Sequence, residues 1–290
     1  MTTIVGPVST QLGFDFVAPR LVKVTPSRLA VWRGCRRRYR LTYLDRPAPP
    51  RGGAWAHSTL GAVVHLALRA LHRSPVSRRT PDGAAALVDR HWSGEGFRDA
   101  AQERDYRERA RGWVADYAEQ HVLGAPEPLG VEQWVSVTTE RVVAEGRVDR
   151  IDGLIRDDGR AEAVVVDYKT GRRAPTDDDA RGSEALALYA VATARTLRRP
   201  CIRVELHHLP TGEVRSVEHD AASLRRHVQR AETTAAELAA ATDALDEGAD
   251  PEALFPPHTS AGCSTCDVRR HCPEGRAAAA DLAPWALLAP

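Results

Sequence analysis

The sequence of 290 residues predicts an α/β fold with a helical N-terminal part, and three observations lead to this prediction. Apolar residues recur at helical spacing through much of the first third of the chain. The middle of the chain alternates apolar and polar residues, as strands with one buried face do. Helical segments then return on both sides of a hairpin-like stretch. With 43% hydrophobic and 27% charged residues, the chain has the composition of a folded globular protein.

The first third of the chain is predicted to be helical. Thr25 and Pro26 can serve as the N-cap and first residue of a helix that runs to about Leu44. A segment rich in proline and glycine then ends this helix. Apolar spacing predicts three more helices, at residues 57–72, 83–93 and 98–122.

The middle of the chain is predicted to form a sheet. The segment QWVSVTTERVVAEGRVDRIDGLI alternates apolar and polar residues, with a reversal expected near Ala144 and Glu145. The segment AEAVVVDYK follows an Asp-Asp-Gly turn, so three adjacent antiparallel strands are the simplest interpretation. The elements expected after them are a helix at 179–197, a hairpin of 201–208 and 213–218, and a long helix at 220–246.

Charge and hydropathy exclude some classes of protein. The formal net charge is +1, so attraction to phosphates must come from local clusters such as WRGCRRRYR at residues 32–40. No stretch approaches the roughly 18 uninterrupted apolar residues that a membrane helix needs. The N-terminus also lacks the basic and then apolar layout of a signal peptide. We therefore expect no membrane partner and a cytoplasmic location.

Two acidic motifs predict a metal site at the end of a strand. Residues two apart on a strand share a face, so Asp167 and Lys169 should project together, roughly 6.5 Å apart. Antiparallel pairing of GRVDRID with VVVDYK would bring Asp149 close to Asp167. Two converging carboxylates form an oxygen-rich site for Mg²⁺ or Mn²⁺. The alternative is a structural surface ion pair between Asp167 and Lys169.

The lysine of this motif is unusual for this chain. Lys169 is one of two lysines, the other being Lys23, although Lys and Arg together number 40. A compact ammonium on a flexible stem can steer a water or stabilise charge on a phosphate, whereas the arginine fork prefers bidentate partners. His65 and Gly61 lie on one face of the predicted 57–72 helix, where the glycine leaves room for a metal or phosphate. A histidine at the boundary of the core is the alternative for His65.

These motifs, in this order, resemble those of the PD-(D/E)XK nucleases in their RecB-like branch, which includes RecB, AddB and the CRISPR adaptation nucleases. GAVVH resembles the histidine motif of that branch, and GRVDRID and VVVDYKTG resemble its second and third motifs. The resemblance implies a restriction-endonuclease-like core, a mixed central sheet flanked by helices, and metal-dependent hydrolysis of phosphodiester bonds in DNA. It also implies that Lys169 positions the attacking water and that the metal is held by His65, Asp149, Asp167 and the backbone carbonyl of Tyr168.

The chain departs from the family pattern in the next helix. The family usually continues with Q-x-x-x-Y, and SEALALYAVA keeps Tyr189, a candidate DNA contact, but has Ala185 at the glutamine position. Glu184 or Ser183 could substitute. A DNA-binding scaffold that keeps the fold but not catalysis is therefore an alternative.

Four of the five cysteines form a candidate metal centre, and Cys201 is left over. The spacing in CSTCDVRRHC is typical of a metal site, and structural zinc with His258 or His271 as a fourth ligand is one interpretation. That interpretation would make the chain a zinc-stabilised interaction protein. In iron-sulfur members of the RecB-like branch, one cysteine precedes the histidine helix and three follow an F-P-P stretch, which FPPHTSAGCSTCDVRRHC resembles. The resemblance thus implies a structural [4Fe-4S] cluster that joins the two ends of the domain through Cys35, Cys263, Cys266 and Cys272.

The arginines around Cys35 have two interpretations. They can form an ordinary solvated helix face or, as we prefer, a track for the DNA backbone beside the cluster. Trp32 and Tyr39 could stack on the bases of a single strand or belong to the core. The arginines concerned are Arg36, Arg37, Arg38 and Arg40.

The sequence as a whole predicts a Mg²⁺- or Mn²⁺-dependent deoxyribonuclease. We expect an exonuclease that acts on single strands or ends, in DNA repair, recombination or processing. No helicase motif is found in the sequence, so we expect a free-standing nuclease; a helicase or repair partner is not identified. The expected organisation is an N-terminal segment, a nuclease domain and a C-terminal tail, at residues 1–24, 25–275 and 276–290.

Overall fold

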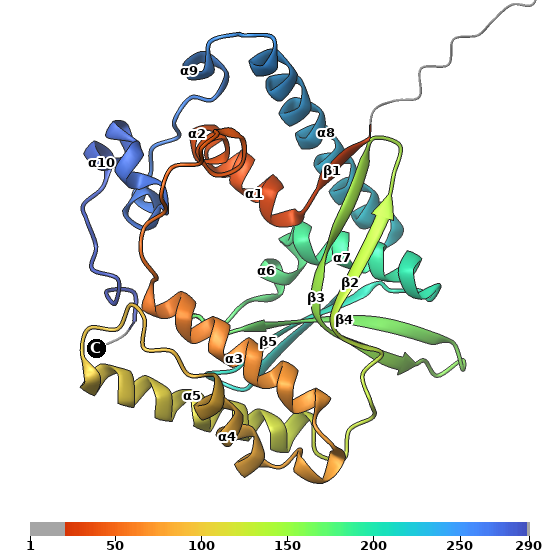
Figure 1. Cartoon of the computed structure of the whole chain (residues 1–290). Helices are drawn as coiled ribbons and strands as arrows, with labels where there is room; N and C mark the ends of the chain where they lie inside the picture. The colour runs from red at the N-terminus through yellow and green to blue at the C-terminus, as the bar shows by residue number, and fades with distance from the viewer. Residues whose placement is uncertain (1–20, 289–290) are drawn as a thin grey trace, which may run out of the picture.

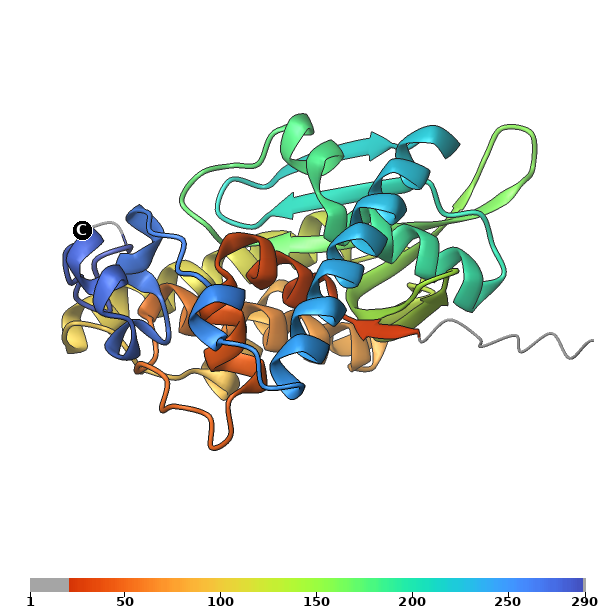
Figure 2. The same cartoon turned by 90° about the horizontal axis from the view of Figure 1, so that it is seen from above.

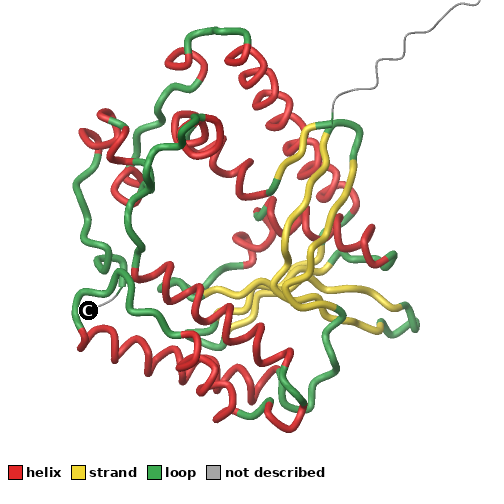
Figure 3. The backbone as a smooth tube through the Cα atoms, in the orientation of Figure 1, coloured by secondary structure: helices red, strands yellow, loops and turns green. Residues whose placement is uncertain are grey.

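A mixed six-stranded sheet organises the chain, as the computed structural model shows for residues 21–288, which it describes (Figure 1). Five strands follow the order β1-β3-β4-β5-β6, and β2 pairs with β3 off this path. Helices lie on both sides of the sheet (Figure 3), which confirms the predicted α/β class. The strands are β1 (Val22–Val24), β2 (Gly130–Thr138), β3 (Val142–Ile155), β4 (Ala161–Lys169), β5 (Arg203–His208) and β6 (Glu213–Glu218).

The long strand β3 connects the two parts of the sheet. It pairs antiparallel with β2 along most of its length, and its last six residues pair antiparallel with β4. The strands β2, β3 and β4 are therefore the three antiparallel strands that the sequence predicted. Strand β1 pairs parallel with β3, β4 pairs parallel with β5, and β5 and β6 form the predicted hairpin.

The reversal between β2 and β3 lies at residues 139–141, so the prediction of a reversal near Ala144 and Glu145 is wrong. The backbone N–H of Thr139 donates to the carbonyl of Val142 at 2.9 Å, and the Thr139 hydroxyl accepts from the N–H of Val142 at 3.3 Å. Ala144 and Glu145 lie within β3, where Ala144 is buried. The buried apolar side chains change from odd positions in β2, at Val135 and Val137, to even positions in β3, at Val142 and Ala144. The polar run TTER between them, with the hydroxyl of Thr139, marks this turn.

Helices occupy most of the remaining chain. Those predicted at 57–72, 83–93, 98–122 and 220–246 are present with ends shifted by a few residues. The α-helices are α1 (Pro26–Gly34), α2 (Arg36–Tyr39), α3 (Ala56–Arg73), α4 (Pro81–His91), α5 (Ala100–His121), α6 (Asp177–Gly182), α7 (Glu184–Leu197), α8 (Ala221–Asp246), α9 (Pro251–Leu254) and α10 (Pro273–Ala278). Shorter turns are the π-helical η1 (Arg40–Leu44) and the 3₁₀ helices η2 (Val76–Arg78), η3 (Ala261–Thr265) and η4 (Arg269–His271).

Two predicted helices are each broken by a residue that caps the next helix. Cys35 is extended, with φ −166° and ψ 113°, and its sulfur accepts from the N–H of Arg38 at 3.4 Å. The single helix predicted for residues 25–44 is therefore divided. Ser183 likewise separates α6 from α7, where its hydroxyl accepts from the N–H of Leu186 at 3.3 Å. Both breaks occur because a side chain satisfies free N–H groups at a helix start.

Each face of β4 belongs to a different core. Alternate side chains of a strand point to opposite faces, and both faces of β4 are buried. Val165 packs in the core formed with α7 and α8, whereas Val164 and Val166 pack against α3, α4 and α5. This double burial produces the continuous AVVV run in the sequence. It also places β4 between two helical layers.

The C-terminal segment returns to the beginning of the described chain. Figures 1 and 2 show the blue segment from α9 to α10 beside α1 and α2. Trp32 and Tyr39 pack with Phe255 in a third core cluster. Beyond α10, the N–H of Ala56 donates to the carbonyl of Pro284 at 3.1 Å, so the tail packs against the start of α3.

The structure describes only part of the predicted N-terminal segment and C-terminal tail. Residues 1–20 of the predicted N-terminal segment, and residues 289–290 of the predicted tail, lie outside the described residues. Residues 22–24 of that segment form β1 and so join the sheet. Within residues 21–288, no helix combines the length and the apolar character that crossing a membrane requires.

Candidate metal centre and cysteine cluster

Asp149, Asp167 and Lys169 meet where β3 and β4 begin to separate. The two strands pair as far as Arg150 and Val166, so the next facing positions are Asp149 and Asp167. Asp149 Oδ2 accepts a hydrogen bond from the backbone N–H of Tyr168 at 3.0 Å. The convergence of the two acidic motifs thus follows from the register of one antiparallel pair.

His65 reaches this point from α3. Its Nδ1 lies 3.3 Å from Asp149 Oδ1. Burial lowers the pKa of His65, but the hydrogen bond and charge of Asp149, helped by the charges of Asp167 and Glu132, outweigh burial and raise that pKa above its ordinary value. Gly61, one turn earlier, lies so close to the loop after β4 that an added Cβ would be 3.1 Å from the hydroxyl of Thr170. A glycine at this position therefore lets α3 approach the site closely.

Asp167 has a partly buried carboxylate. Its Oδ2 forms an ion pair with the ammonium of Lys169. Burial raises the pKa of the Asp167 carboxyl, Lys169 lowers it and Asp149 raises it, with a net rise. A carboxylate oxygen that contacts a cation in this way suits a metal ligand, because a metal ion can take the place of the ammonium.

Glu132 is a carboxylate of the site that the sequence analysis missed. One ligand atom from each of His65, Glu132 and Asp149 lies within 4.8 Å of the other two. On β2 the flanking residues Val131 and Gln133 pair with Arg150 and Val148, so Glu132 stands opposite Asp149. Its φ of 52° is in the left-handed region, which residues other than glycine seldom adopt.

This carboxylate could have been found from sequence if the turn had been placed correctly. A reversal at 139–141 pairs Glu132 with Asp149, whereas a reversal near Ala144 removes Glu132 from the site. Among the described residues, Asp167 does not join the close group of His65, Glu132 and Asp149. It stands beside that group, turned toward Lys169.

Each carboxylate of the site has a cationic side chain as its partner. Glu132 Oε2 is 2.6 Å from Arg147 Nε, Asp149 contacts His65, and Asp167 contacts Lys169. Three acids this close repel one another unless cations compensate their charge. A divalent ion can provide the same compensation, so the donor set and its charge fit Mg²⁺ or Mn²⁺.

Tyr168 and Tyr189 frame the site from two sides. The Tyr168 side chain is buried on the opposite face of the sheet, with its hydroxyl 3.3 Å from His72 Nε2, so its backbone alone faces the acids. Tyr189 packs on Gly146, where an added Cβ would come within 2.5 Å of the ring. Burial and the charges of Asp167 and Asp149 raise the pKa of Tyr189 to about 12. Tyr189 therefore lies beside the carboxylates, as the Q-x-x-x-Y resemblance implies.

The two residues that could substitute for the missing glutamine bind elsewhere. Arg33 Nη1 donates to Glu184 at 2.8 Å, which holds the glutamate against α1. The hydroxyl of Ser183 caps α7. Ala185 thus has no replacement among these two neighbours.

The metal centre opens into a cleft of about 900 Å³. Its walls come from α3 on one side and from β2 and β3 on the other, with Tyr189 and Thr170 at its end. An elongated polyanion could reach the acids through this opening. The side chains that line it around the centre include His65, Leu66, Arg69, Trp134, Arg147 and Asp149.

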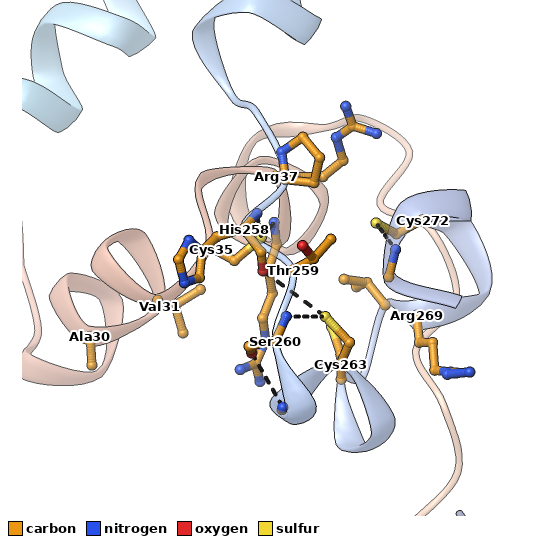
Figure 4. Close-up of a pocket in the computed structure, with 17 residues that line it drawn as sticks. Ala30, Val31, Cys35, Arg37, His258, Thr259, Ser260, Cys263, Arg269 and Cys272 are labelled. Carbon is orange, nitrogen blue, oxygen red and sulfur yellow. Dashed lines mark hydrogen bonds between the residues drawn. The ribbon is translucent and has the colours of Figure 1, made fainter. Parts of the chain in front are cut away.

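The four candidate cysteines line a second cavity, of about 280 Å³, between α1, α2 and the C-terminal segment (Figure 4). Backbone N–H groups of His258, Ser260 and Gly275 donate to the sulfurs of Cys35, Cys263 and Cys272, at 3.3–3.5 Å. Such donors stabilise the thiolates that ligate metals. The four thiols that share this cavity belong to Cys35, Cys263, Cys266 and Cys272.

The remaining cysteine and the two candidate histidines have other surroundings. Cys201 is buried in the core of the sheet, and burial raises the pKa of its thiol to about 12. His271 Nε2 lies 3.0 Å from the carbonyl of Pro50, outside the cavity lining. His258 lines the cavity, where its backbone N–H donates to Cys35.

The arginines of α2, and Arg40 at the start of η1, are bound to acids of distant segments. Arg37 is 8% exposed and forms ion pairs with Glu252 and, at 3.2 Å, with Glu274. The interpretation of a solvated helix face is therefore wrong for Arg37. Arg36, Arg38 and Arg40 pair with Glu237, Asp267 and Glu252 at 3.0, 2.8 and 3.1 Å. Contact of these arginines with DNA stays a prediction.

Trp32 and Tyr39 belong to the core. They are 2% and 3% exposed, and their rings meet edge to face with centroids 5.4 Å apart. Stacking on DNA bases would require exposed rings, so this alternative is wrong for both.

Comparison with known proteins agrees with the arrangement of the site. No curated protein matches the chain. A family model described as the PD-(D/E)XK nuclease superfamily matches residues 23–273, which is most of the sequence. This range contains the histidine of α3, the acids of β2, β3 and β4, and all four clustered cysteines. Nucleases of this superfamily use divalent metals, and the chain belongs to the PD-(D/E)XK nuclease superfamily.

Proposed function

We propose that the protein is a Mg²⁺- or Mn²⁺-dependent deoxyribonuclease of the RecB-like branch, acting as an exonuclease on single strands or DNA ends. The observation that carries this proposal is the register of β3 and β4, which sets Asp149 opposite Asp167 with Lys169 beside it. The biological role that we propose is DNA repair, recombination or processing. The nuclease domain that we propose comprises residues 25–275, with β1 as an additional edge strand.

The residues of the site have separate tasks in this proposal. His65, Asp149, Asp167 and the carbonyl of Tyr168 hold the metal, and Glu132 adds a further carboxylate. The metal, when bound, lowers the pKa of a water ligand and compensates charge on the phosphate. Lys169, released from Asp167, positions the attacking water and donates to a phosphate oxygen. Arg147 is likewise freed when Glu132 takes a metal as its partner.

We further propose that the four cysteines bind a [4Fe-4S] cluster with a structural role. A zinc ion with Zn–S bonds of about 2.3 Å would bring its four sulfurs to roughly 3.8 Å from one another. Within the described residues, no three of these thiols lie within 4.8 Å of one another. This wider spacing, around a cavity of about 280 Å³, supports a cluster over a single zinc ion.

Cleavage of end-labelled DNA tests the nuclease proposal. Single-stranded and double-stranded substrates labelled at either end are incubated with Mg²⁺, Mn²⁺ or EDTA. We expect metal-dependent cleavage that begins at an end and is lost in Asp149→Ala. A wild-type protein that binds these substrates but cleaves none of them in either metal is a DNA-binding scaffold, which refutes the proposal.

A further inference from the structure

Two large apolar side chains are exposed in the cleft beside the metal centre. Trp134 on β2 is 59% exposed and Leu66 on α3 is 41% exposed, and both line the same cleft. Exposing an indole to water costs free energy that burial would recover, so such a residue in a ligand cleft suggests an apolar part of the ligand. None of the aromatic contacts within residues 21–288 involves Trp134.

The position of Trp134 relates it to the reacting centre. Trp134 faces Arg147 across the β2–β3 pair, and Arg147 precedes Asp149 by two residues on β3. Two residues along a strand span roughly 6.5 Å and return to the same face. Trp134 is therefore two residues along the sheet from the candidate metal carboxylates, a step comparable with one nucleotide of an extended strand.

Leu66 and Arg69 lie on α3, which forms the wall of the cleft opposite Trp134. Leu66 follows His65 directly, and Arg69 lies one turn further along the same side of α3. Both line the cleft with Trp134. Arg69 forms no ion pair with any residue of the described range 21–288, and Arg147 is half exposed with Glu132 as its partner. The apolar surface is thus flanked by two cations, which is the pattern of a nucleotide site with a base between phosphates.

We propose that Trp134 stacks on one unpaired base next to the scissile phosphate, that Leu66 contacts the same nucleotide, and that Arg69 and Arg147 contact the neighbouring phosphates. In a duplex both faces of a base are covered by adjacent bases, so the indole can stack only on an unpaired or terminal base. Trp134 is then the residue that selects unpaired or terminal bases at this cleft. This inference rests on the proposed deoxyribonuclease function and assigns its base contact.

The test measures cleavage of single-stranded DNA under single-turnover conditions, with K½ and the maximal rate determined separately. A series of oligonucleotides carries one abasic site at each position in turn. For Trp134→Ala we expect K½ to rise about tenfold or more, as when one base–aromatic stack is lost. Trp134→Phe should restore most of the affinity. Ile155→Ala, which also removes an exposed apolar side chain but outside the cleft, is the matched control and should behave as the wild type.

The abasic series separates stacking from a general structural effect. At one position, an abasic site should raise the K½ of the wild type as much as Trp134→Ala raises it on intact DNA. The same abasic site should raise the K½ of Trp134→Ala hardly further, because both changes remove the same contact. Arg69→Ala should weaken binding of every oligonucleotide alike, whereas Arg73→Ala on the same helix, outside the cleft, should not.

Two results would overturn the inference. One is an unchanged K½ for Trp134→Ala, and the other is an equal loss at every abasic position, which indicates a structural role or a protein partner for this surface. If the wild type cleaves no DNA, the proposed nuclease function fails on its own. Binding of the same abasic series in Mn²⁺, measured by fluorescence anisotropy, then decides whether Trp134 contacts a base.

Discussion

Replacement of Glu132 by glutamine tests the carboxylate that the structure adds to the metal centre. Glutamine keeps the size of the side chain and the strain at φ 52°, so the change removes little more than the charge. Glu132 lies within 4.8 Å of Asp149, and two negative charges at that distance repel by about 3.5 kcal/mol at an effective dielectric constant of about 20. The ion pair with the half-exposed Arg147 offsets part of this, by up to about 1 kcal/mol.

The same substitution should have opposite effects with and without metal. Without metal, Glu132→Gln relieves repulsion, so the free energy of unfolding should stay constant or rise by about 1–2 kcal/mol. With metal, the lost ligand should weaken Mn²⁺ binding by about a hundredfold, and the stabilisation by Mn²⁺ should fall by about 2.7 kcal/mol at matched concentration. Activity should fall with the affinity.

Isothermal titration calorimetry measures the affinity for Mn²⁺, and thermal unfolding with and without Mn²⁺ measures the stabilisation. Glu145→Gln is the matched control, because Glu145 also lies on the β2–β3 sheet and also has a cationic partner, Lys23, at 3.1 Å. It should leave Mn²⁺ binding unchanged. If Glu132→Gln binds Mn²⁺ as tightly as the wild type does, Glu132 is no ligand and its closeness to His65 and Asp149 has no part in metal binding.

Three further predictions concern the lysine, the cysteines and pH. Lys169→Arg should slow single-turnover cleavage roughly a hundredfold with unchanged melting temperature, because the broad guanidinium displaces the water or the phosphate, whereas Lys23→Arg should be silent; equal rates would assign Lys169 to a structural ion pair. Cys266→Ser should lose the visible absorbance of the cluster and melt earlier, while the buried Cys201→Ser should keep its colour; zinc without iron in the wild type would refute the cluster. The contact of protonated His65 with Asp149 stabilises the metal-free fold below the ordinary pKa of about 6.5 and is lost as pH rises through the raised pKa. Calorimetry should therefore show Mn²⁺ affinity rising with pH through this range, as the imidazole loses its proton, and a flat profile would contradict the assignment of His65 as a ligand.

Much of the site was predictable because its residues lie in local patterns. The apolar run before Asp167, the facing motif around Asp149 and the short turn between them determine one antiparallel register, and that register alone sets the acids opposite each other. Helical spacing puts His65 and Gly61 on one face of α3, and the resemblance to the RecB-like histidine motif assigned His65 to the site. Hydrophobic periodicity reports burial and element type directly, which is why the α/β class was predicted correctly.

What local patterns could not reveal depends on partners that are distant in the sequence. The ion pairs of Arg37 join it to acids more than 200 residues away, and nothing near Arg37 distinguishes such a buried cation from one that binds a phosphate backbone. The core positions of Trp32 and Tyr39 likewise depend on Phe255, which the C-terminal segment brings to them. A sequence shows which side chains are charged or aromatic. Whether such a side chain is buried or free to bind DNA depends on the segments that pack against it.

The sequence by itself determined the fold class, the convergence of Asp149 with Asp167 and Lys169, and the grouping of Cys263, Cys266 and Cys272, because each rests on spacing within a strand, a helix or a short motif. The cluster that joins Cys35 to these three rested on the resemblance to the RecB-like nucleases. The tertiary structure then placed Glu132 with His65 and Asp149 in the candidate metal centre, and Trp134 in the lining of its cleft. Glu132 and Trp134 both lie on β2, whose register depends on a turn closed by the hydroxyl of Thr139. In an antiparallel pair, the position of the turn determines every facing residue, so a turn misplaced by a few residues sets a different side chain opposite Asp149.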